Sequence, residues 1–253
     1  MALVSTEAIV LQTHAYGDTS KILRFLTRSH GVRSAIAKGA LRPKSRYGGV
    51  LEPFSVGTAV LYLKDGRELQ TLGGFELIHS GQPLGRDLLR FGAASLLAEL
   101  VLRSASEEPD PGLYDRVRAA LLRLEAAEPG AVEATALSTA WSLIGRLGFA
   151  PSFDTCIGCD RTLDDDEPAH FDYVAGSVRC AECAPGAAAG RELPPHARAA
   201  LMRLASGDAP RLDRTAAHWA LLTKFLTHHI LDGGSLRSLS FLAEALDAAS
   251  CAS

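Results

Sequence analysis

The sequence predicts an α+β protein of more than one domain, in which a small five-stranded barrel precedes an α-helical domain that carries a cysteine-rich module. Three observations predict this architecture. Apolar residues alternate along residues 1–80, apolar residues recur at three- and four-residue spacings from residue 84 onward, and two Cys-x-x-Cys pairs interrupt the helical pattern at about residues 152–185. Alternation is typical of strands and the wider spacing of helices. We therefore expect one domain over residues 1–80 and a second over 81–253.

The first domain contains five strand-like segments, at residues 6–14, 21–27, 32–38, 54–63 and 68–80. Asp65-Gly66 between the last two segments predicts a tight hairpin. Gly73-Gly74 in the last segment allows a bulge or a sharp bend. Five strands with one strongly bent member predict a closed barrel of the OB-fold type.

A basic block covers residues 20–47, which hold eight Lys or Arg and no Asp or Glu. Residues 1–80 hold ten basic against six acidic residues, a net of +4, whereas residues 81–253 hold sixteen against twenty-three, a net of −7. The overall charge of −3 therefore hides a polar distribution. A solvated sheet face is the alternative interpretation, but a basic block without interleaved acids favours binding of a polyanion.

Residues 38–49, the basic loop, include three glycines and a proline, so they predict an irregular segment that can follow a phosphate backbone. If the segments at 21–27 and 32–38 pair as a hairpin, Arg24 and Arg33 share an outward face. Tyr47 and Tyr62 are candidate stacking platforms for bases. The predicted nucleic-acid contacts are Arg24, Arg33, Lys38, Arg42, Lys44, Arg46 and Tyr47.

The helices of the second domain are predicted to form a packed bundle that has no catalytic chemistry of its own. Helices are expected at residues 84–103, 113–128 and 131–148, then from Pro194 to about residue 206, at 213–232 with a stop at Gly233-Gly234, and at 236–246. No apolar run reaches the roughly 18 residues that span a bilayer, and the first ten residues lack the pattern of a secretory signal. We therefore expect a cytoplasmic protein without a membrane partner.

The two Cys-x-x-Cys pairs, Cys156 with Cys159 and Cys180 with Cys183, are separated by twenty residues. This spacing predicts a zinc module in which four thiolates hold one ion. Because four cysteine ligands leave no position for water, the ion is expected to be structural, contributing on the order of 10 kcal/mol to local folding. His170, between the pairs, is interpreted as an unligated loop residue.

The sequence lacks the motifs of zinc deaminases, nucleotide-binding enzymes, metalloproteases and serine hydrolases. A zinc deaminase needs His-x-Glu and a proline before the second cysteine pair, and neither is present. We find no P-loop, no Gly-x-Gly-x-x-Gly after a strand, no His-Glu-x-x-His and no nucleophile elbow. Together with the basic block, this favours a binding protein over an enzyme.

Several segments, in the right order from residue 5 to about 185, resemble the bacterial RecO family of recombination mediators. They are TEAIVLQTHAYGDTSKILRFLTRSHG, AKGALRPKSRYGGVLEPFS, and RLGFAPSFDTCIGC with CAEC. The resemblance implies a nucleoid-associated DNA repair protein that binds single- and double-stranded DNA and anneals complementary strands. With the partner RecR it would help RecA replace single-strand-binding protein (SSB), whose acidic C-terminal tail it would contact through its helical part.

Carried over by position, the resemblance implies that Lys38, Arg42, Lys44 and Arg46 contact DNA and that the four cysteines bind zinc. The sequence departs from the family pattern at Leu41, where a further basic residue is frequent, and at Asp160, where glycine is common. Two other functions stay open on the residues alone. One is an RNA-binding OB-fold and zinc-ribbon protein of translation or RNA processing. The other is a zinc hydrolase, which requires an open coordination position.

Overall fold

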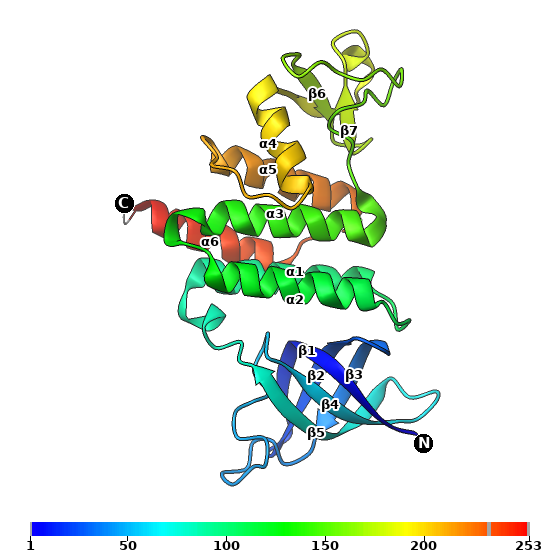
Figure 1. Cartoon of the computed structure of the whole chain (residues 1–253), viewed down its shortest axis with the longest axis vertical. Helices are drawn as coiled ribbons and strands as arrows, with labels where there is room; N and C mark the ends of the chain where they lie inside the picture. The colour runs from blue at the N-terminus through cyan, green and yellow to red at the C-terminus, as the bar shows by residue number, and fades with distance from the viewer. Residues whose placement is uncertain (1, 232–233, 252–253) are drawn as a thin grey trace. The chain divides into compact units, whose positions relative to one another are not determined.

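The structure, a computed structural model, describes residues 2–231 and 234–251. The chain divides into two compact units, residues 1–126 with 248–253, and residues 127–247. The first unit contains the barrel and two helices (Figure 1). The change from strands to helices that the sequence predicts near residue 80 therefore falls inside this unit.

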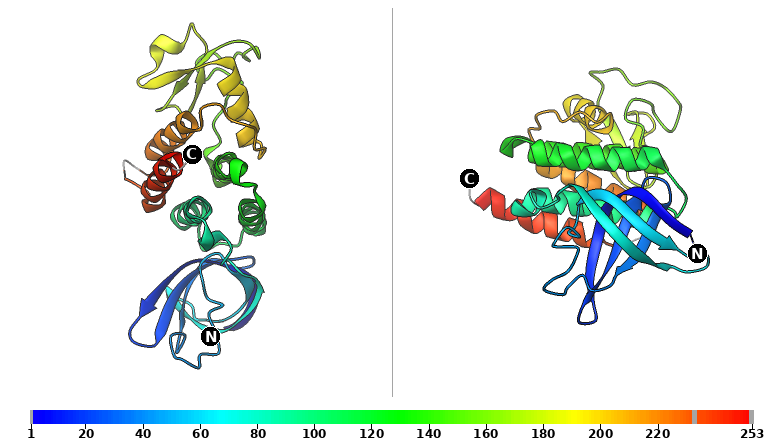
Figure 2. Two further views of the ribbon diagram at one scale, coloured as in Figure 1. Left: turned by 90° about the vertical axis from the view of Figure 1, so that its left-hand side faces the viewer. Right: turned by 60° about the horizontal axis from the view of Figure 1, so that its bottom comes forward.

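Five strands form the barrel, β1 (Ala2–Tyr16), β2 (Ser20–Thr27), β3 (Gly31–Ala37), β4 (Val56–Leu63) and β5 (Leu69–His79). They close in the order β1-β2-β3-β5-β4, with only the β3 and β5 pair parallel (Figure 2). The long strand β1 pairs with β2 through one part and with β4 through the other. The predicted five-stranded barrel is confirmed, and this arrangement is that of an OB-fold.

A bulge interrupts the pairing of β4 and β5 and bends the strands locally. The register of β4 and β5 shifts between Val60, which pairs with Gly74, and Leu61, which pairs with Leu72. Gly73 is thus the extra residue of a bulge, as its sequence context predicts. A Cβ at this position would lie 2.8 Å from the ring of Tyr62, so glycine is required there.

Alternate residues of the strands point inward and form the barrel core, together with residues of the segment between β3 and β4. The core contains Ala8, Val10, Leu23, Phe25, Ala35, Ala37, Tyr47, Leu51, Ala59, Leu61 and Leu72. Tyr47 and Leu51 close the barrel interior from the end of the basic loop. The loop is thereby anchored at one end by apolar burial.

Helices α1 (Leu88–Ser104) and α2 (Pro111–Ala126) follow a short turn, η1 (Leu84–Arg86). The side chain of Asp87 caps α1 by accepting a hydrogen bond from the backbone N–H of Arg90. Helix α1 packs against β1 and α2. Its Phe91 makes an edge contact with Phe54, ring centroids 5.7 Å apart.

The second unit contains α3 (Val132–Ile144), α4 (Pro195–Ala205), α5 (Thr215–His229) and most of α6 (Arg237–Cys251). The turn η2 (Pro129–Ala131) precedes α3, and a π-helical turn, η3 (Gly145–Phe149), extends it. Helix α3 packs against α4 and α5. The helix stop expected at Gly233 lies outside the described residues. None of the helices that the structure describes is long and apolar enough to span a membrane.

The cysteine module is built on a three-stranded sheet, β6 (Ala169–Asp172), β7 (Ser177–Arg179) and β8 (Gly190–Leu193), in the order β7-β6-β8. A short turn, η4 (Ala184–Gly186), follows the second cysteine pair. The sequence predicted no strand here, and the expectation of a mid-loop His170 is wrong because this residue lies in β6. Strands of three or four residues carry too little alternation to be recognised.

Candidate metal centre and nucleic-acid interface

The four cysteines Cys156, Cys159, Cys180 and Cys183 come together as predicted. Their Sγ atoms all lie within 4.8 Å of one another, and those of Cys159 and Cys180 are 3.9 Å apart. A tetrahedral zinc ion with Zn–S bonds of about 2.3 Å separates its sulfur ligands by about 3.8 Å. The donor set and its spacing therefore fit one zinc ion held by thiolates.

Backbone groups around Cys156 favour its thiolate form, the form that binds metal. Cys156 Sγ accepts hydrogen bonds from the backbone N–H groups of Cys180 (3.2 Å) and Gly158 (3.4 Å). Burial opposes ionisation of Cys156, but these backbone N–H groups outweigh it and lower the pKa of the thiol to about 6. A Cβ at Gly158 would lie 3.0 Å from Cys183 Sγ, so a larger residue there would crowd one of the four cysteines.

A buried arginine and an aromatic cluster attach the cysteine module to the helices of its unit. Arg198 of α4 is only 2% exposed and donates hydrogen bonds to the carbonyl oxygens of Phe153 and Asp164. Phe153 also packs edge-on against Trp141 of α3, with ring centroids 5.8 Å apart. The cysteine module is thus packed against α3 and α4 of the second unit.

The basic loop is an exposed cationic segment of the first unit. Lys38, Arg42, Lys44 and Arg46 are all exposed. Among the described residues, the first three form no ion pair, and Arg46 donates to the hydroxyl of Tyr47 (3.0 Å). Successive turns shape the loop, with Arg42 N–H donating to Gly39 and Ser45 N–H to Arg42. It therefore presents four solvated cations on a turn-rich backbone.

The loop adjoins the outer face of the β1 and β2 hairpin. The backbone N–H of Leu41 donates to the carbonyl of Thr19, 2.9 Å away in the turn between these strands. On β1, Gln12, His14 and Tyr16 alternate onto the face opposite the core residues, and Gln12 pairs with Arg24. The Nε atom of Arg24 is buried and has no partner among the described residues. One continuous outer surface, the hairpin face, thus carries Arg24, His14 and Tyr16.

Arg33 does not share this face, so the expectation that it lies beside Arg24 is wrong. The hairpin forms as predicted, but Arg33 pairs with the core residue Phe25 and Arg24 pairs with Ser34. At the end of the barrel, the Arg33 side chain turns to an ion pair with Glu107 (2.7 Å). Lys21 and Arg28 of the same block are also paired, with Glu52 (3.0 Å) and Asp115 (3.0 Å).

Tyr47 is the second candidate that the structure corrects. Its ring is 3% exposed within the barrel core, and its hydroxyl donates to the carbonyl of Leu72 (3.1 Å). It therefore has no free surface for a base, although Tyr62, with 39% exposure, does. The aromatic residue that sequence reasoning missed is Tyr16, which is 54% exposed on the hairpin face. Its alternation with Gln12 and His14 before a Gly-Asp turn was the available signal.

Two sequence-family models together match most of the chain. A model described as Recombination protein O N terminal matches residues 1–81, and one described as Recombination protein O C terminal matches residues 85–239. The chain belongs to the RecO family. The RecO match therefore covers both the barrel and the helices that carry the cysteine module.

Two RecO relatives match over nearly the full length of the chain, and a third matches over about 70% of it. The DNA repair protein RecO of Anaeromyxobacter sp. (strain K) is 31% identical over 256 residues, covering 96% of this chain and 97% of the relative. That of Nocardioides sp. is 32% identical over 251 residues, covering 95% and 99%. The Bacillus subtilis protein is 32% identical over 183 residues, covering 72% and 69%. This RecO-family membership indicates a role in DNA repair and recombination, and nothing in the comparisons supports the RNA-directed alternative.

The two departures from the RecO pattern have distinct structural settings. Leu41 is 40% exposed on the basic loop, so a cation there would be solvated and would add to the positive surface. Asp160 has φ +57°, a left-handed conformation that favours glycine and that Asp tolerates better than most residues. The glycine that the resemblance leads us to expect at this position therefore agrees with the backbone conformation.

Proposed function

We propose that this protein is a non-catalytic DNA repair mediator that binds single- and double-stranded DNA, anneals complementary strands and, with RecR, promotes loading of RecA on SSB-coated single strands. The observation that carries the proposal is the contiguity of the basic loop with the hairpin face. Four solvated cations lie next to a surface bearing Arg24 and the exposed ring of Tyr16. Cations that track phosphates next to an aromatic platform for bases are the usual elements of single-strand binding.

Annealing follows from the same electrostatics. Two complementary strands repel each other through the negative charges of their phosphates. Cations on the protein neutralise part of this charge and release the counterions that are bound there, so that the two strands can meet. Bases held on the hairpin face stay unstacked and open to a second strand. The proposed reaction requires no catalytic group, which agrees with the interpretation of the cysteine cluster as a structural zinc centre.

The proposed structural zinc would be held by Cys156, Cys159, Cys180 and Cys183. When bound, it would supply a closed tetrahedral cross-link between the two knuckles. Backbone N–H groups donate hydrogen bonds to Cys156 Sγ, and Arg198 of α4 donates to the carbonyl oxygen of Asp164 in the intervening loop. These contacts position the cysteine module, and none of them requires a catalytic role for the metal.

The proposed partners are DNA, RecR, the C-terminal tail of SSB and, indirectly, RecA, which places the protein in the bacterial cytoplasm at the nucleoid. These assignments rest on the family membership and not on a particular contact. They are tested by adding the protein, alone and with RecR, to SSB-coated DNA. Faster RecA assembly only when both are present is the expected result.

The interface is tested by changing Lys38, Arg42, Lys44 and Arg46 together to Ala. Because about 0.7 counterion is released per phosphate contact on a single strand, the slope of log affinity against log salt should fall by about 3 for labelled oligo-dT. Binding to all sequences should weaken alike. Lys64 and Arg67, exposed cations of the β4 and β5 turn, provide the matched control as a double Ala variant. Equal losses in both variants would remove the basic loop from the interface.

A further inference from the structure

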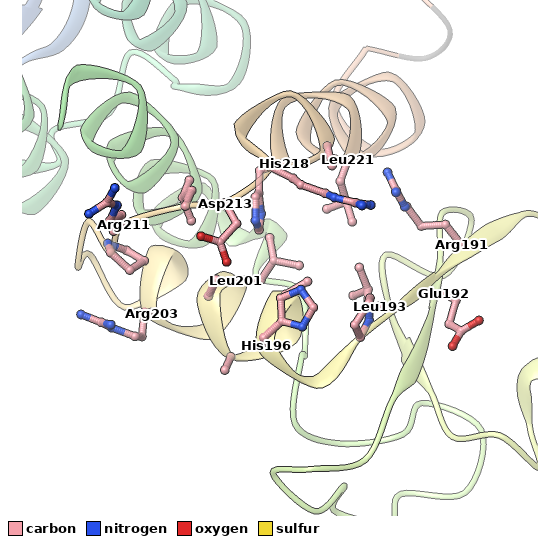
Figure 3. Close-up of a pocket in the computed structure, with 18 residues that line it drawn as sticks. Arg191, Glu192, Leu193, His196, Leu201, Arg203, Arg211, Asp213, His218 and Leu221 are labelled. Atoms are coloured by element: carbon pink, nitrogen blue, oxygen red, sulfur yellow. The ribbon is translucent and has the colours of Figure 1, made fainter. Parts of the chain in front are cut away.

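A groove in the second unit lies between β8, α4 and α5 and encloses about 730 Å³. Figure 3 shows His196 of α4 and His218 of α5 on opposite walls, with Asp213 and Leu201 between them. A volume of this size lies within the range of about 300–1,000 Å³ that is common for ligand pockets. It can hold a short stretch of an extended single strand but not a duplex.

Positive charge is concentrated at this groove in an otherwise acidic unit. Residues 127–247 contain sixteen Asp or Glu and ten Lys or Arg. Four of these ten cations line the groove, namely Arg191, Arg203, Arg211 and Arg214, and we call this site the arginine groove. A unit with net negative charge thus places much of its positive charge on one concave surface, where the field of the charges is focused.

Most of these arginines lack a protein counter-ion. Arg203 pairs with Asp208 (2.6 Å), but Arg191, Arg211 and Arg214 form no ion pair among the described residues. Two arginines outside the groove have carboxylate partners: Arg161 pairs with Glu167 (2.6 Å) and Arg179 with Asp172 (2.8 Å). The groove therefore presents guanidinium groups that no carboxylate neutralises among the described residues.

The histidines of the groove lie within electrostatic range of these cations. Burial first, and then the charges of Arg191 and His196, lower the pKa of His218, which is 8% exposed. Like charges converging on one cavity are relieved by a bound anion. Asp213 and Glu192 are the two acids of the lining, against four arginines, so the balance stays positive.

The composition of the groove favours a nucleic acid as the anion. Guanidinium groups bind phosphate oxygens in bidentate fashion, and arginine planes and imidazole rings stack on unpaired bases. Leu193, Leu201 and Leu221 supply an apolar floor for sugars and base edges. We propose that the arginine groove binds the phosphates of a single nucleic-acid strand and is a second strand site, formed by residues other than those of the basic loop.

This proposal rests on the proposed function, because annealing requires that two strands be held. The test uses full-length protein with Arg191, Arg211 and Arg214 changed together to Gln. Lys224→Gln is the matched control, since Lys224 is an exposed cation on α5 that does not line the groove. Circular dichroism and thermal unfolding check that both variants fold.

The first readout is binding of labelled oligo-dT in the background of the four basic-loop substitutions, where the groove is expected to supply the residual affinity. The triple change should remove this residual binding and lower its salt slope by about 2, whereas Lys224→Gln should change little. Asp213→Asn, which removes a negative charge from the groove, should strengthen this residual binding of oligo-dT. The second readout is annealing by the protein with an intact loop, which should slow about tenfold in the triple variant, a difference of about 1.4 kcal/mol.

Annealing and residual binding at the rate and affinity of the Lys224→Gln control would overturn the groove proposal while leaving the loop interface intact. Failure of the unchanged protein to bind oligo-dT at low salt would instead overturn the proposed function. A labelled acidic peptide serves as a further probe. If the triple variant loses the peptide but keeps all of its DNA binding, the groove is a protein-docking site and the strand proposal is wrong.

Discussion

Arg33 Nη1 lies 2.7 Å from the carboxylate of Glu107, so an arginine from the centre of the basic block is held in an ion pair instead of facing solvent. Its strand register places it opposite Phe25, on the inward side of the hairpin. The block therefore separates into two sets. Lys21, Arg28 and Arg33 are held in ion pairs within the first unit, whereas the exposed cations of the basic loop are available to a ligand. Arg24 forms no ion pair among the described residues, and its Nε atom is buried.

The two sets predict opposite consequences of single substitutions. Arg33→Ala should change affinity for single-stranded DNA by less than about twofold and lower the free energy of unfolding by up to about 1 kcal/mol, because Glu107 is exposed. Arg42→Ala should leave unfolding unchanged and reduce the salt slope by about 0.7. Salt-series titrations and thermal unfolding of both variants provide the measurement. A larger loss of DNA affinity for Arg33→Ala than for Arg42→Ala would contradict this division.

The exposed ring of Tyr16 predicts a difference between single and double strands. Tyr16→Ala should weaken binding of oligo-dT by about 1–3 kcal/mol, the usual contribution of a stacked base. Tyr16→Phe should retain it, since stacking needs only the ring. Binding of a duplex should change little because its bases are already stacked. Tyr62→Ala, at the other exposed aromatic candidate of the barrel strands, is the comparison, and equal effects of the two Ala variants would argue against a platform specific to Tyr16.

Patterns that depend on many residues could be predicted from the sequence, and single side-chain directions could not. Alternation over long strands, the Gly73 bulge and the cysteine spacing each involve a repeated or paired signal, and each is confirmed. The direction of Arg33 depends on which of two alternating faces lines the barrel, and that is decided by closure of the whole sheet. Tyr47 was misassigned because a loop tyrosine gives no local sign that it enters a core.

Removal of metal should unfold the cysteine module while the barrel stays folded. Structural zinc contributes on the order of 10 kcal/mol, and the sheet of β6, β7 and β8 is too small to stand without it. Hydrogen exchange after chelation should therefore rise across residues 155–193 and not across the barrel strands. Cys156→Ser should reproduce this pattern, and Cys251→Ser, outside both cysteine pairs, should not.

The spectrum of the cobalt-substituted protein distinguishes a structural from a catalytic metal. Four thiolate ligands predict a closed tetrahedral spectrum without a water ligand, as expected from the Sγ atoms clustered within 4.8 Å. Observation of bound water would revive the hydrolase interpretation. Binding of oligo-dT through the basic loop should persist in the chelated protein, because the loop belongs to the other unit.

The backbone of Asp160 predicts a stabilising substitution. This residue follows Cys159 with φ +57°, and its N–H donates to the carbonyl of Cys156, 2.8 Å away. Asp160→Gly should relieve the left-handed strain and stabilise the module by up to about 1 kcal/mol, whereas Asp160→Ala should destabilise it. The measurement is the chelator concentration that removes half of the metal.

Two further variants separate the backbone effect from the effect of charge. Asp160→Asn removes the carboxylate beside the thiolates but keeps a side chain that tolerates the left-handed conformation, so any gain in this variant is electrostatic. Asp165→Gly makes the same chemical change at a residue without positive φ. There the added freedom of the unfolded chain should destabilise the module by about 0.4–1 kcal/mol. Gains of the same size at residues 160 and 165 would show that loss of charge, and not the backbone of Asp160, controls stability.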